Sequence, residues 1–301
     1  MSSEYMMSWI NTIFRWLPAL AIGIGLITRL GAEFTWLIQP SLMVIIFHTF
    51  IDSRAQIWKN VSKFHLYVIL GQVSIAIGIF FLLNLFSLEV AAAGLVIALA
   101  PTAVSAGTVA SGLRVNLSHV MSVIVVTNLF ACITFSIIPP LIGNDSYSFT
   151  STLEPFRIVG MTVVIPLIVS KILLRYGRFS GDWKPKKYVG FAIRFLWAAI
   201  LGVSASKVGV WYFENTQAGL ADLAWPLLLG VGIFTIFATV GYYLPQESKL
   251  GSLISFSHKN SGLALLLIIN TFPMSAVAVI LSYSLSQNIF FSMLIGRTAP
   301  R

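Results

Sequence analysis

The stretch Ser255-Phe256-Ser257-His258-Lys259-Asn260-Ser261-Gly262-Leu263-Ala264 lies inside an otherwise apolar segment that covers residues 251–271. About 20 mostly apolar residues are enough to cross a bilayer as a helix. Consecutive polar side chains, one of them a lysine, are costly in hydrocarbon and mark a candidate functional site. Lys259 has apolar sequence on both sides, so its side chain cannot easily reach an interface. The competing interpretation is a structural Lys259 that pairs with a carbonyl or a helix C-terminus.

The composition of the whole chain agrees with a membrane protein. Of the 301 residues, 57% are hydrophobic and only 10% are charged. Soluble domains carry about 25% charged residues, so a soluble enzyme and a disordered chain are excluded. The single cysteine, Cys132, excludes an internal disulfide and a cysteine-based metal site. The four histidines have no metal-ligand spacing, so we expect neither a metal nor a cofactor.

Ten apolar segments are long enough to be spanning helices, and none shows the alternation of a membrane barrel strand. They cover residues 10–29, 33–51, 64–86, 89–113, 117–142, 152–174, 188–206, 222–244, 251–271 and 275–296. The sequence therefore predicts an all-α integral membrane protein with ten transmembrane helices.

The distribution of the 19 Lys and Arg residues predicts the orientation of these helices. Short cytoplasmic connections are enriched in Lys and Arg. The odd-numbered connections hold only Arg29, Arg157 and Lys207, whereas the even-numbered connections and the two ends hold many more. Those residues are Arg15, Arg54, Lys59, Lys63, Arg114, Lys171, Arg175, Arg178, Lys184, Lys186, Lys187, Lys249, Arg297 and Arg301. We therefore expect both termini in the cytoplasm, and the net charge of +9 indicates orientation rather than nucleic-acid binding.

Five helices in each half, residues 1–150 and 151–301, predict two inverted repeats, as in many secondary transporters. The fourth segment of each half is unusual in this chain. Segment four reads Ala100-Pro101-Thr102-Ala103-Val104-Ser105-Ala106-Gly107-Thr108-Val109-Ala110-Ser111-Gly112. Small polar residues and glycine at this depth predict a broken helix, although close helix packing is an alternative reason for them. We expect the binding site where segments four and nine meet.

Several short motifs resemble those of the bile acid:sodium symporter family. Asn260-Ser261-Gly262-Leu263-Ala264 is similar to the family's Q-N-S-G-L-A, and Gln287-Asn288-Ile289 is similar to its H-N-I. Pro101 matches the start of the family's P-G-G-T-A-S-N stretch in segment four. The resemblance implies a panel domain of helices 1, 2, 6 and 7. It also implies a core domain of helices 3–5 and 8–10, in which broken helices 4 and 9 cross. The related auxin efflux carriers share this fold.

The chain departs from this family at the positions that bind sodium. Ser255 stands where the resemblance implies a glutamate, and Lys259 stands where it implies a glutamine. Ala106 and Gly107 replace the family's Ser-Asn ligands. Thr127 and Asn128 keep polarity near the family's first sodium site, and Gln72 in helix 3 lies close to a glutamine of the family. An ammonium close to a cation would be repelled in a low dielectric. We therefore expect the Lys259 ammonium to replace the sodium ion, with oxygen partners from segment four, Thr127, Asn128 or Ser255.

The expected substrate is a small or amphipathic organic anion. Helix N-termini at a crossover favour negative charge, Lys259 adds a positive charge, and every Asp and Glu falls in or near a connection. The resemblance also implies an organic anion. The candidate substrate contacts are Thr102, Ser105, Thr108, His258, Asn260, Ser261 and Asn288.

The sequence thus predicts a carrier that works by alternating access and that is not an enzyme. Because desolvation disfavours a charged lysine, protons are a possible coupling partner. Sodium coupling on the same fold is one alternative, and a channel or a non-transporting receptor is another. The expected location is a bacterial inner (plasma) membrane, where the lipid bilayer is the surrounding partner. The sequence does not set the oligomeric state.

Overall fold

The computed structural model describes residues 3–53, 60–142, 157–176, 187–215, 219–245, 248–270 and 272–298. Within these ranges the chain is helical, and the only β-type pairing is one isolated bridge. The elements are α1 (Ser3–Thr28), η1 (Ala32–Leu37), α2 (Ile38–Ser53), α3 (Lys63–Asn84), α4 (Leu88–Leu99), α5 (Ala106–Gly112), α6 (Leu117–Ile142), η3 (Gly160–Val164), α8 (Ile165–Arg175), α9 (Lys187–Glu214), α10 (Leu220–Tyr243), α11 (Lys249–Ser257), α12 (Ser261–Ile268) and α13 (Met274–Thr298). The predicted all-α class is confirmed.

Seven of the described helical segments are long and apolar enough to cross a membrane. Their outward faces carry large apolar side chains, such as Leu70, Ile168 and Leu228, which are exposed. In water such a surface would be unfavourable, whereas in a bilayer it faces lipid. The chain is therefore a multi-pass membrane protein.

The described part of each of the ten predicted segments contains helix. Segments four and nine each contain two short helices joined by unwound residues, as expected for broken helices. Segment seven is longer than predicted, because α9 continues through Lys207 to Glu214. The sequence between these two residues is mostly apolar and contains no proline that would end a helix.

Some sequence-based expectations concern parts of the chain outside the described residues. The predicted boundary between the two halves, at residues 150 and 151, is one of them. The basic residues that lie outside are Arg54, Lys59, Arg178, Lys184, Lys186 and Arg301.

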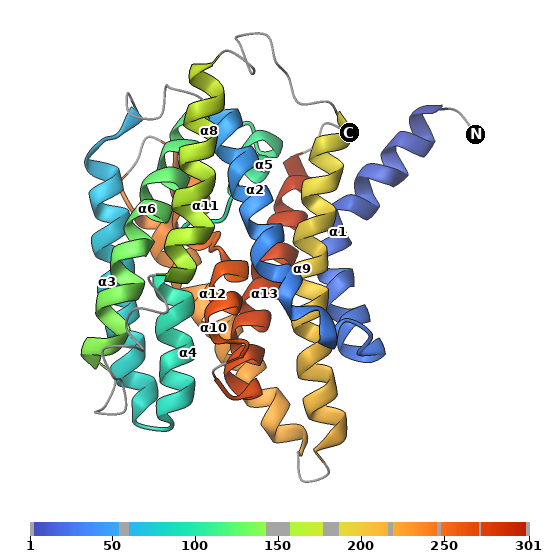
Figure 1. Cartoon of the computed structure of the whole chain (residues 1–301), viewed down its shortest axis with the longest axis vertical. Helices are drawn as coiled ribbons and strands as arrows, with labels where there is room; N and C mark the ends of the chain where they lie inside the picture. The colour runs from blue at the N-terminus through green and yellow to red at the C-terminus, as the bar shows by residue number, and fades with distance from the viewer. Residues whose placement is uncertain are drawn as a thin grey trace.

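Two helix pairs pack especially closely in this bundle (Figure 1). α1 runs along α9, where a Cβ atom on Gly25 would collide with the backbone carbonyl of Gly202. α10 runs along α13, where a Cβ atom on Gly230 would collide with the carbonyl of Val279. Small residues at such crossings let helix backbones approach, which is a common basis of helix association in membranes.

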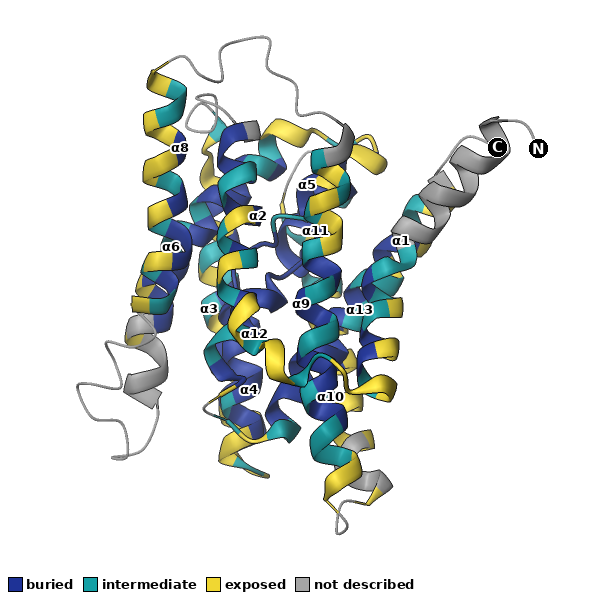
Figure 2. Cartoon of the chain, turned by 45° about the vertical axis from the view of Figure 1, so that its right-hand side comes forward, coloured by how far each residue is buried: buried dark blue, intermediate teal, exposed yellow. Residues whose placement is uncertain are grey.

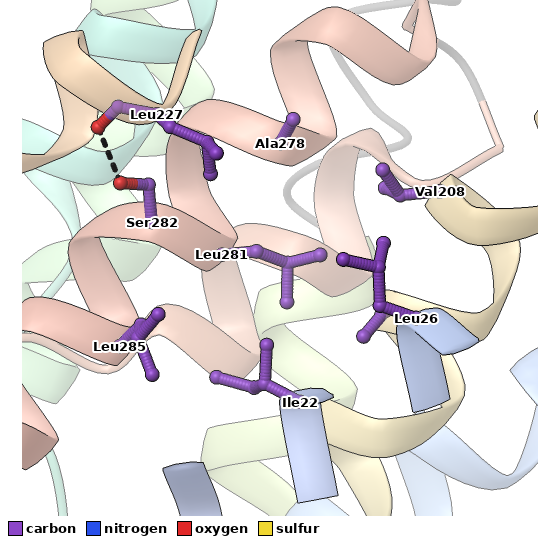
Figure 3. A pocket seen from close by; sticks show the side chains of 9 residues that line it. Ile22, Leu26, Val208, Leu227, Ala278, Leu281, Ser282 and Leu285 are labelled. Carbon is purple, nitrogen blue, oxygen red and sulfur yellow. Dashed lines mark hydrogen bonds between the residues drawn. The ribbon is translucent and has the colours of Figure 1, made fainter. Parts of the chain in front are cut away.

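A small apolar pocket lies between these two pairs, where side chains of α1, α9, α10 and α13 meet (Figure 3). Its cavity volume is about 30 Å³, which is room for about one water molecule. Its polar group is Ser282, whose Oγ donates to the carbonyl of Leu227 within the α10–α13 pair. The pocket is lined by Ile22, Leu26, Ala205, Val208, Leu227, Ala278, Leu281, Ser282 and Leu285. The most buried part of the molecule lies elsewhere, around the two broken segments (Figure 2).

Candidate functional site: the paired breaks in two helices

The two broken segments meet through their unwound residues. Thr102 and Lys259 form an isolated antiparallel bridge. The Ala103 amide donates to the His258 carbonyl at 2.6 Å, and the Asn260 amide donates to the Pro101 carbonyl at 2.7 Å. Backbone groups at helix ends lack partners within their own helix and cannot remain unpaired in a bilayer. Each break therefore supplies hydrogen bonds that the other needs.

Side chains from α3 and α6 hold the break between α4 and α5. α4 ends before Pro101, because a proline has no amide proton and restricts the preceding residue. The Gln72 side chain donates to the freed carbonyls of Leu99 and Ala100. Thr127 Oγ1 accepts from the Thr102 amide, and Asn128 Nδ2 donates to the Thr102 carbonyl, both at 3.1 Å.

Side chains from α13 hold the break between α11 and α12. Gln287 binds both sides of one residue: its Oε1 accepts from the Lys259 amide at 2.9 Å, and its Nε2 donates to the Lys259 carbonyl at 3.1 Å. The Tyr283 hydroxyl donates to the Ser257 carbonyl at 2.7 Å. These contacts fix the backbone from which the Lys259 side chain projects.

The Lys259 side chain is fully buried, with 0% exposure. Its Nζ lies 4.4 Å from the ring centroid of Phe237 in α10 and 5.3 Å from that of Phe256 in α11. Nζ has no hydrogen-bond partner. None of the expected oxygen atoms, from segment four, Thr127, Asn128 or Ser255, forms a hydrogen bond with Nζ, and Thr127 and Asn128 bind the Thr102 backbone. Two aromatic faces, which attract cations weakly compared with oxygen ligands, surround the amine instead.

The positions of the implied sodium ligands lie around the two paired breaks. Ser255 is fully buried and its Oγ has no hydrogen-bond partner. The same holds for Asn128 Oδ1 and Gln72 Oε1. Ala106 and Gly107 are buried in the first two positions of α5 and supply no side-chain oxygen. The described residues hold no group of three or more metal-ligating side chains.

The candidate substrate residues separate into a buried and a more accessible set. Thr102, Asn260 and Ser261 are buried. Thr102 Oγ1 donates to the Ser255 carbonyl, Asn260 Oδ1 caps the Leu263 amide, and Ser261 Oγ donates to Ser284. These groups therefore stabilise the crossover itself.

The more accessible set comprises Ser105, Asn288 and Thr108, of which Thr108 is exposed and the other two are half-buried. Ser105 Oγ is hydrogen-bonded to His258 Nε2 at 3.0 Å, so the two breaks are also linked by side chains. Asn288 Nδ2 donates to the Ser284 carbonyl at 2.7 Å. His258 is buried, and its ring stands edge-on to Phe291.

Phe237, Tyr283 and Gln287 are site residues that the sequence did not single out. Gln287 was visible only as part of its Gln-Asn-Ile motif, and nothing in the sequence relates Phe237 to Lys259. A contact between α10 and a residue 22 positions later depends on helix packing, which no local pattern encodes.

No family profile and no curated protein matches this chain. The resemblance based on short motifs therefore stays a prediction.

Proposed function

We propose that this protein is a secondary transporter that moves a small or amphipathic organic anion across the membrane by alternating access. The observation that carries this proposal is Lys259, a fully buried lysine at the point where two broken helices pair. In transporters, helices broken near the midplane place backbone groups at the substrate and ion sites. A lysine that served only to anchor the fold would be expected to bind a carbonyl, and Lys259 Nζ binds none.

The charge around the crossover favours an anion over a cation. The acidic residues whose burial is described, Glu33, Glu89 and Glu214, are all exposed. Two side-chain nitrogens just before α12 have no hydrogen-bond partner, Asn260 Nδ2 and His258 Nδ1. The first is a donor, the second is a donor when it carries a proton, and both residues are 2% exposed. A helix N-terminus carries a partial positive charge. Ser105, Thr108 and Asn288 supply polar groups where the crossover reaches the surface.

The close packing of α1 with α9 and of α10 with α13 supports a division of the protein into two parts that move against each other. We assign α1, α2, α8 and α9 to the panel, and α3–α6 and α10–α13 to the core. α1–α9 and α10–α13 are closely packed within their parts, while the apolar pocket of Figure 3 lies between them. In this proposal the halves 1–150 and 151–301 are inverted repeats with both termini in the cytoplasm of a bacterial cell.

Lys259 takes the role of the sodium ion in the proposed cycle. As an ammonium it supplies the positive charge that a bound cation would supply. As a neutral amine it fits the apolar cage of Phe237 and Phe256, since burial disfavours the charged form. Exchange between these forms would couple transport to protons, whereas a permanently charged Lys259 would give uncoupled transport.

The test combines ligand-dependent stabilisation with flux. The purified protein is screened by thermal unfolding against a panel of monocarboxylates, dicarboxylates and amphipathic carboxylates, with sodium or choline, at several pH values. A ligand that binds the folded state raises the melting temperature. The best anion is then measured by counterflow in proteoliposomes, in the native protein, in Lys259→Gln and in Lys249→Gln. Lys249 is a matched control, because its Nζ also lies over an aromatic ring, that of Tyr242 at 5.1 Å, but the residue is exposed.

Saturable counterflow that needs no sodium, is lost in Lys259→Gln and persists in Lys249→Gln is the expected result. Flux without counterflow would identify a channel, and binding without flux would identify a receptor. Either outcome would overturn the proposal. So would unchanged transport in Lys259→Gln.

Sodium coupling is the second candidate, and one observation favours it. Three buried side-chain oxygens have no hydrogen-bond partner: Gln72 Oε1, Asn128 Oδ1 and Ser255 Oγ. The Gln72 and Asn128 side chains bind the backbone of Ala100 and Thr102, and the Ser255 carbonyl accepts from the Thr102 side chain, so all three residues lie next to the first break. Oxygen atoms of this kind are ligands for hard cations. A melting temperature that rises with sodium but not with choline, and a flux that needs a sodium gradient, would favour this candidate.

A further inference from the structure

A second lysine, Lys207, makes a specific contact between the two proposed moving parts. It lies within α9, and its side chain is half-buried. Lys207 Nζ donates to the Ile269 carbonyl at 3.0 Å and to Asn270 Oδ1 at 2.8 Å, at the C-terminal end of α12. Carbonyls at a helix C-terminus lack intrahelical partners and carry a partial negative charge, so a lysine stabilises them well.

The N-terminal end of α12 is also held against α9 and α2. A Cβ atom on Gly262 would lie 2.7 Å from Trp197 Cζ3 and 2.9 Å from Leu42 Cδ2, so these side chains touch the α12 backbone directly. α12 is therefore fixed to the panel at both ends. Its first five residues are all buried.

The corresponding half-helix of segment four, α5, is much less enclosed. Thr108, Ser111 and Gly112 are exposed, although α5 begins at the same crossover as α12. α5 and α12 run from the crossover toward opposite ends of the molecule (Figure 1). The crossover is thus more enclosed on its α12 side than on its α5 side.

We infer that Lys207 is a positioning residue, which holds α12 against α9 and closes this end of the interface between panel and core. The apolar surfaces of Figure 3 begin beside it, since Ala205 and Val208 line that pocket. The apolar surfaces of panel and core can separate without breaking hydrogen bonds. The Lys207 hydrogen bonds would therefore be the contacts that specifically stabilise the closed arrangement of α9 and α12. The role of this contact in transport rests on the proposed function. Its effect on the closed end of the interface can be measured without substrate.

The experiment measures thiol reactivity at both ends of the interface. Cys132, the native cysteine, is replaced by alanine, and a single cysteine is introduced as Ala205→Cys or Ser111→Cys. Ala205 is fully buried at the α12 end, and Ser111 is exposed at the α5 end. The protein is placed in lipid nanodiscs, where a water-soluble maleimide reaches both membrane faces. Each reporter is combined with Lys207, Lys207→Met and Lys207→Arg.

With Lys207 present, the thiol at 111 is expected to react quickly and the thiol at 205 slowly. Lys207→Met should raise the rate at 205 by about tenfold, because both Nζ hydrogen bonds are lost and water partly replaces them at this half-buried position. The rate at 111 should fall at the same time, because opening one end of a two-state interface closes the other. Lys207→Arg, which keeps a charged donor, should restore the original rates.

Three results would overturn the inference. The first is unchanged reactivity at both positions in Lys207→Met, and the second is a rise at both, which indicates general loosening from a merely structural contact. The third is slow reaction at 111 when Lys207 is present. If Lys207→Met does not fold, Asn270→Ala removes one of the two contacts at an exposed residue and should give the same opposed changes, smaller in size. If the two thiol reaction rates change in opposite directions but the protein shows no flux, the role of Lys207 in closing the interface is supported and the proposed transport function is rejected.

Discussion

Two breaks meet at the crossover, one between α4 and α5 and one between α11 and α12. They differ in their residue types and in the side chains that bind them. The first consists mainly of small residues, Ala100 to Ser105, and three side chains from α3 and α6 bind its backbone. The second carries His258, Lys259 and Asn260, and Gln287 binds the backbone amide and carbonyl of Lys259. The first break thus provides mainly backbone groups, while the second provides the charge. Function should therefore depend on side chains in the second break and on backbone geometry in the first.

The largest expected effects come from the two glutamines that anchor the breaks. Gln287→Leu removes two hydrogen bonds from the Lys259 backbone, whose amide and carbonyl keep contacts with the Ser257 carbonyl and the Ser261 amide. It should lower the free energy of unfolding by about 1–3 kcal/mol, at about 0.5–1.5 kcal/mol for each bond. Gln72→Leu, the matched change at the first break, removes the donor to the Leu99 and Ala100 carbonyls and should also cost about 1–3 kcal/mol. Unfolding by denaturant titration in detergent measures both, and clearly unequal losses would show that the two breaks are not anchored equally well.

Replacing Lys259 should raise the stability of the protein while abolishing its transport activity. Lys259→Met keeps the length of the side chain and removes an amine that has no hydrogen-bond partner, so we expect the protein to be about 1–3 kcal/mol more stable. Anion transport should be lost. Lys249→Met, at an exposed lysine, should change stability by less than about 0.5 kcal/mol. A destabilised Lys259→Met would mean that the amine is bound more favourably than its contacts with Phe237 and Phe256 indicate.

Two glycines, Gly107 near the start of α5 and Gly262 near the start of α12, test how tightly the helix after each break is enclosed. Gly262→Ala pushes a methyl group against Trp197 and Leu42 and should cost about 1–3 kcal/mol. In Gly107→Ala the methyl group would lie 2.8 Å from Met121 Sδ, the end of a flexible side chain that can move aside. The higher helix propensity of alanine then offsets much of the cost. Melting temperatures compare the pair, and a larger loss in Gly107→Ala would reverse the assignment of the closed end.

The smallest effect is expected at the side-chain link between the breaks. Ser105→Ala removes the hydrogen bond to His258 and should change anion affinity by about 0.5–1.5 kcal/mol, the usual worth of one such bond. The anion concentration that gives half of the full thermal shift measures this change. Thr108→Ala, at an exposed residue of α5, serves as the comparison within the same helix. An effect confined to Thr108 would place the anion away from the second break.

Most helices of this protein were predictable, because each consists of an apolar run longer than the bilayer requires. The ends were harder to place: α9 continues past Lys207, since nothing in the following residues stops a helix. The two breaks were also predictable, because Pro101 and the polar run at 258–261 do not fit a continuous helix in hydrocarbon. Whether the two halves form inverted repeats stays a prediction, as does the suggested family.

The amino-acid sequence by itself determined that this is a helical membrane protein with a lysine in an apolar segment, because transfer of polar groups into hydrocarbon depends on composition alone. The tertiary structure decided what surrounds that lysine. Phe237 comes from another helix, and Thr127 Oγ1 and Asn128 Nδ2 bind the Thr102 backbone rather than Nζ. It also showed that Lys207 contacts the end of α12 rather than lying in a connection. Such contacts depend on the relative rotation and depth of packed helices, which residues far apart in the sequence determine together.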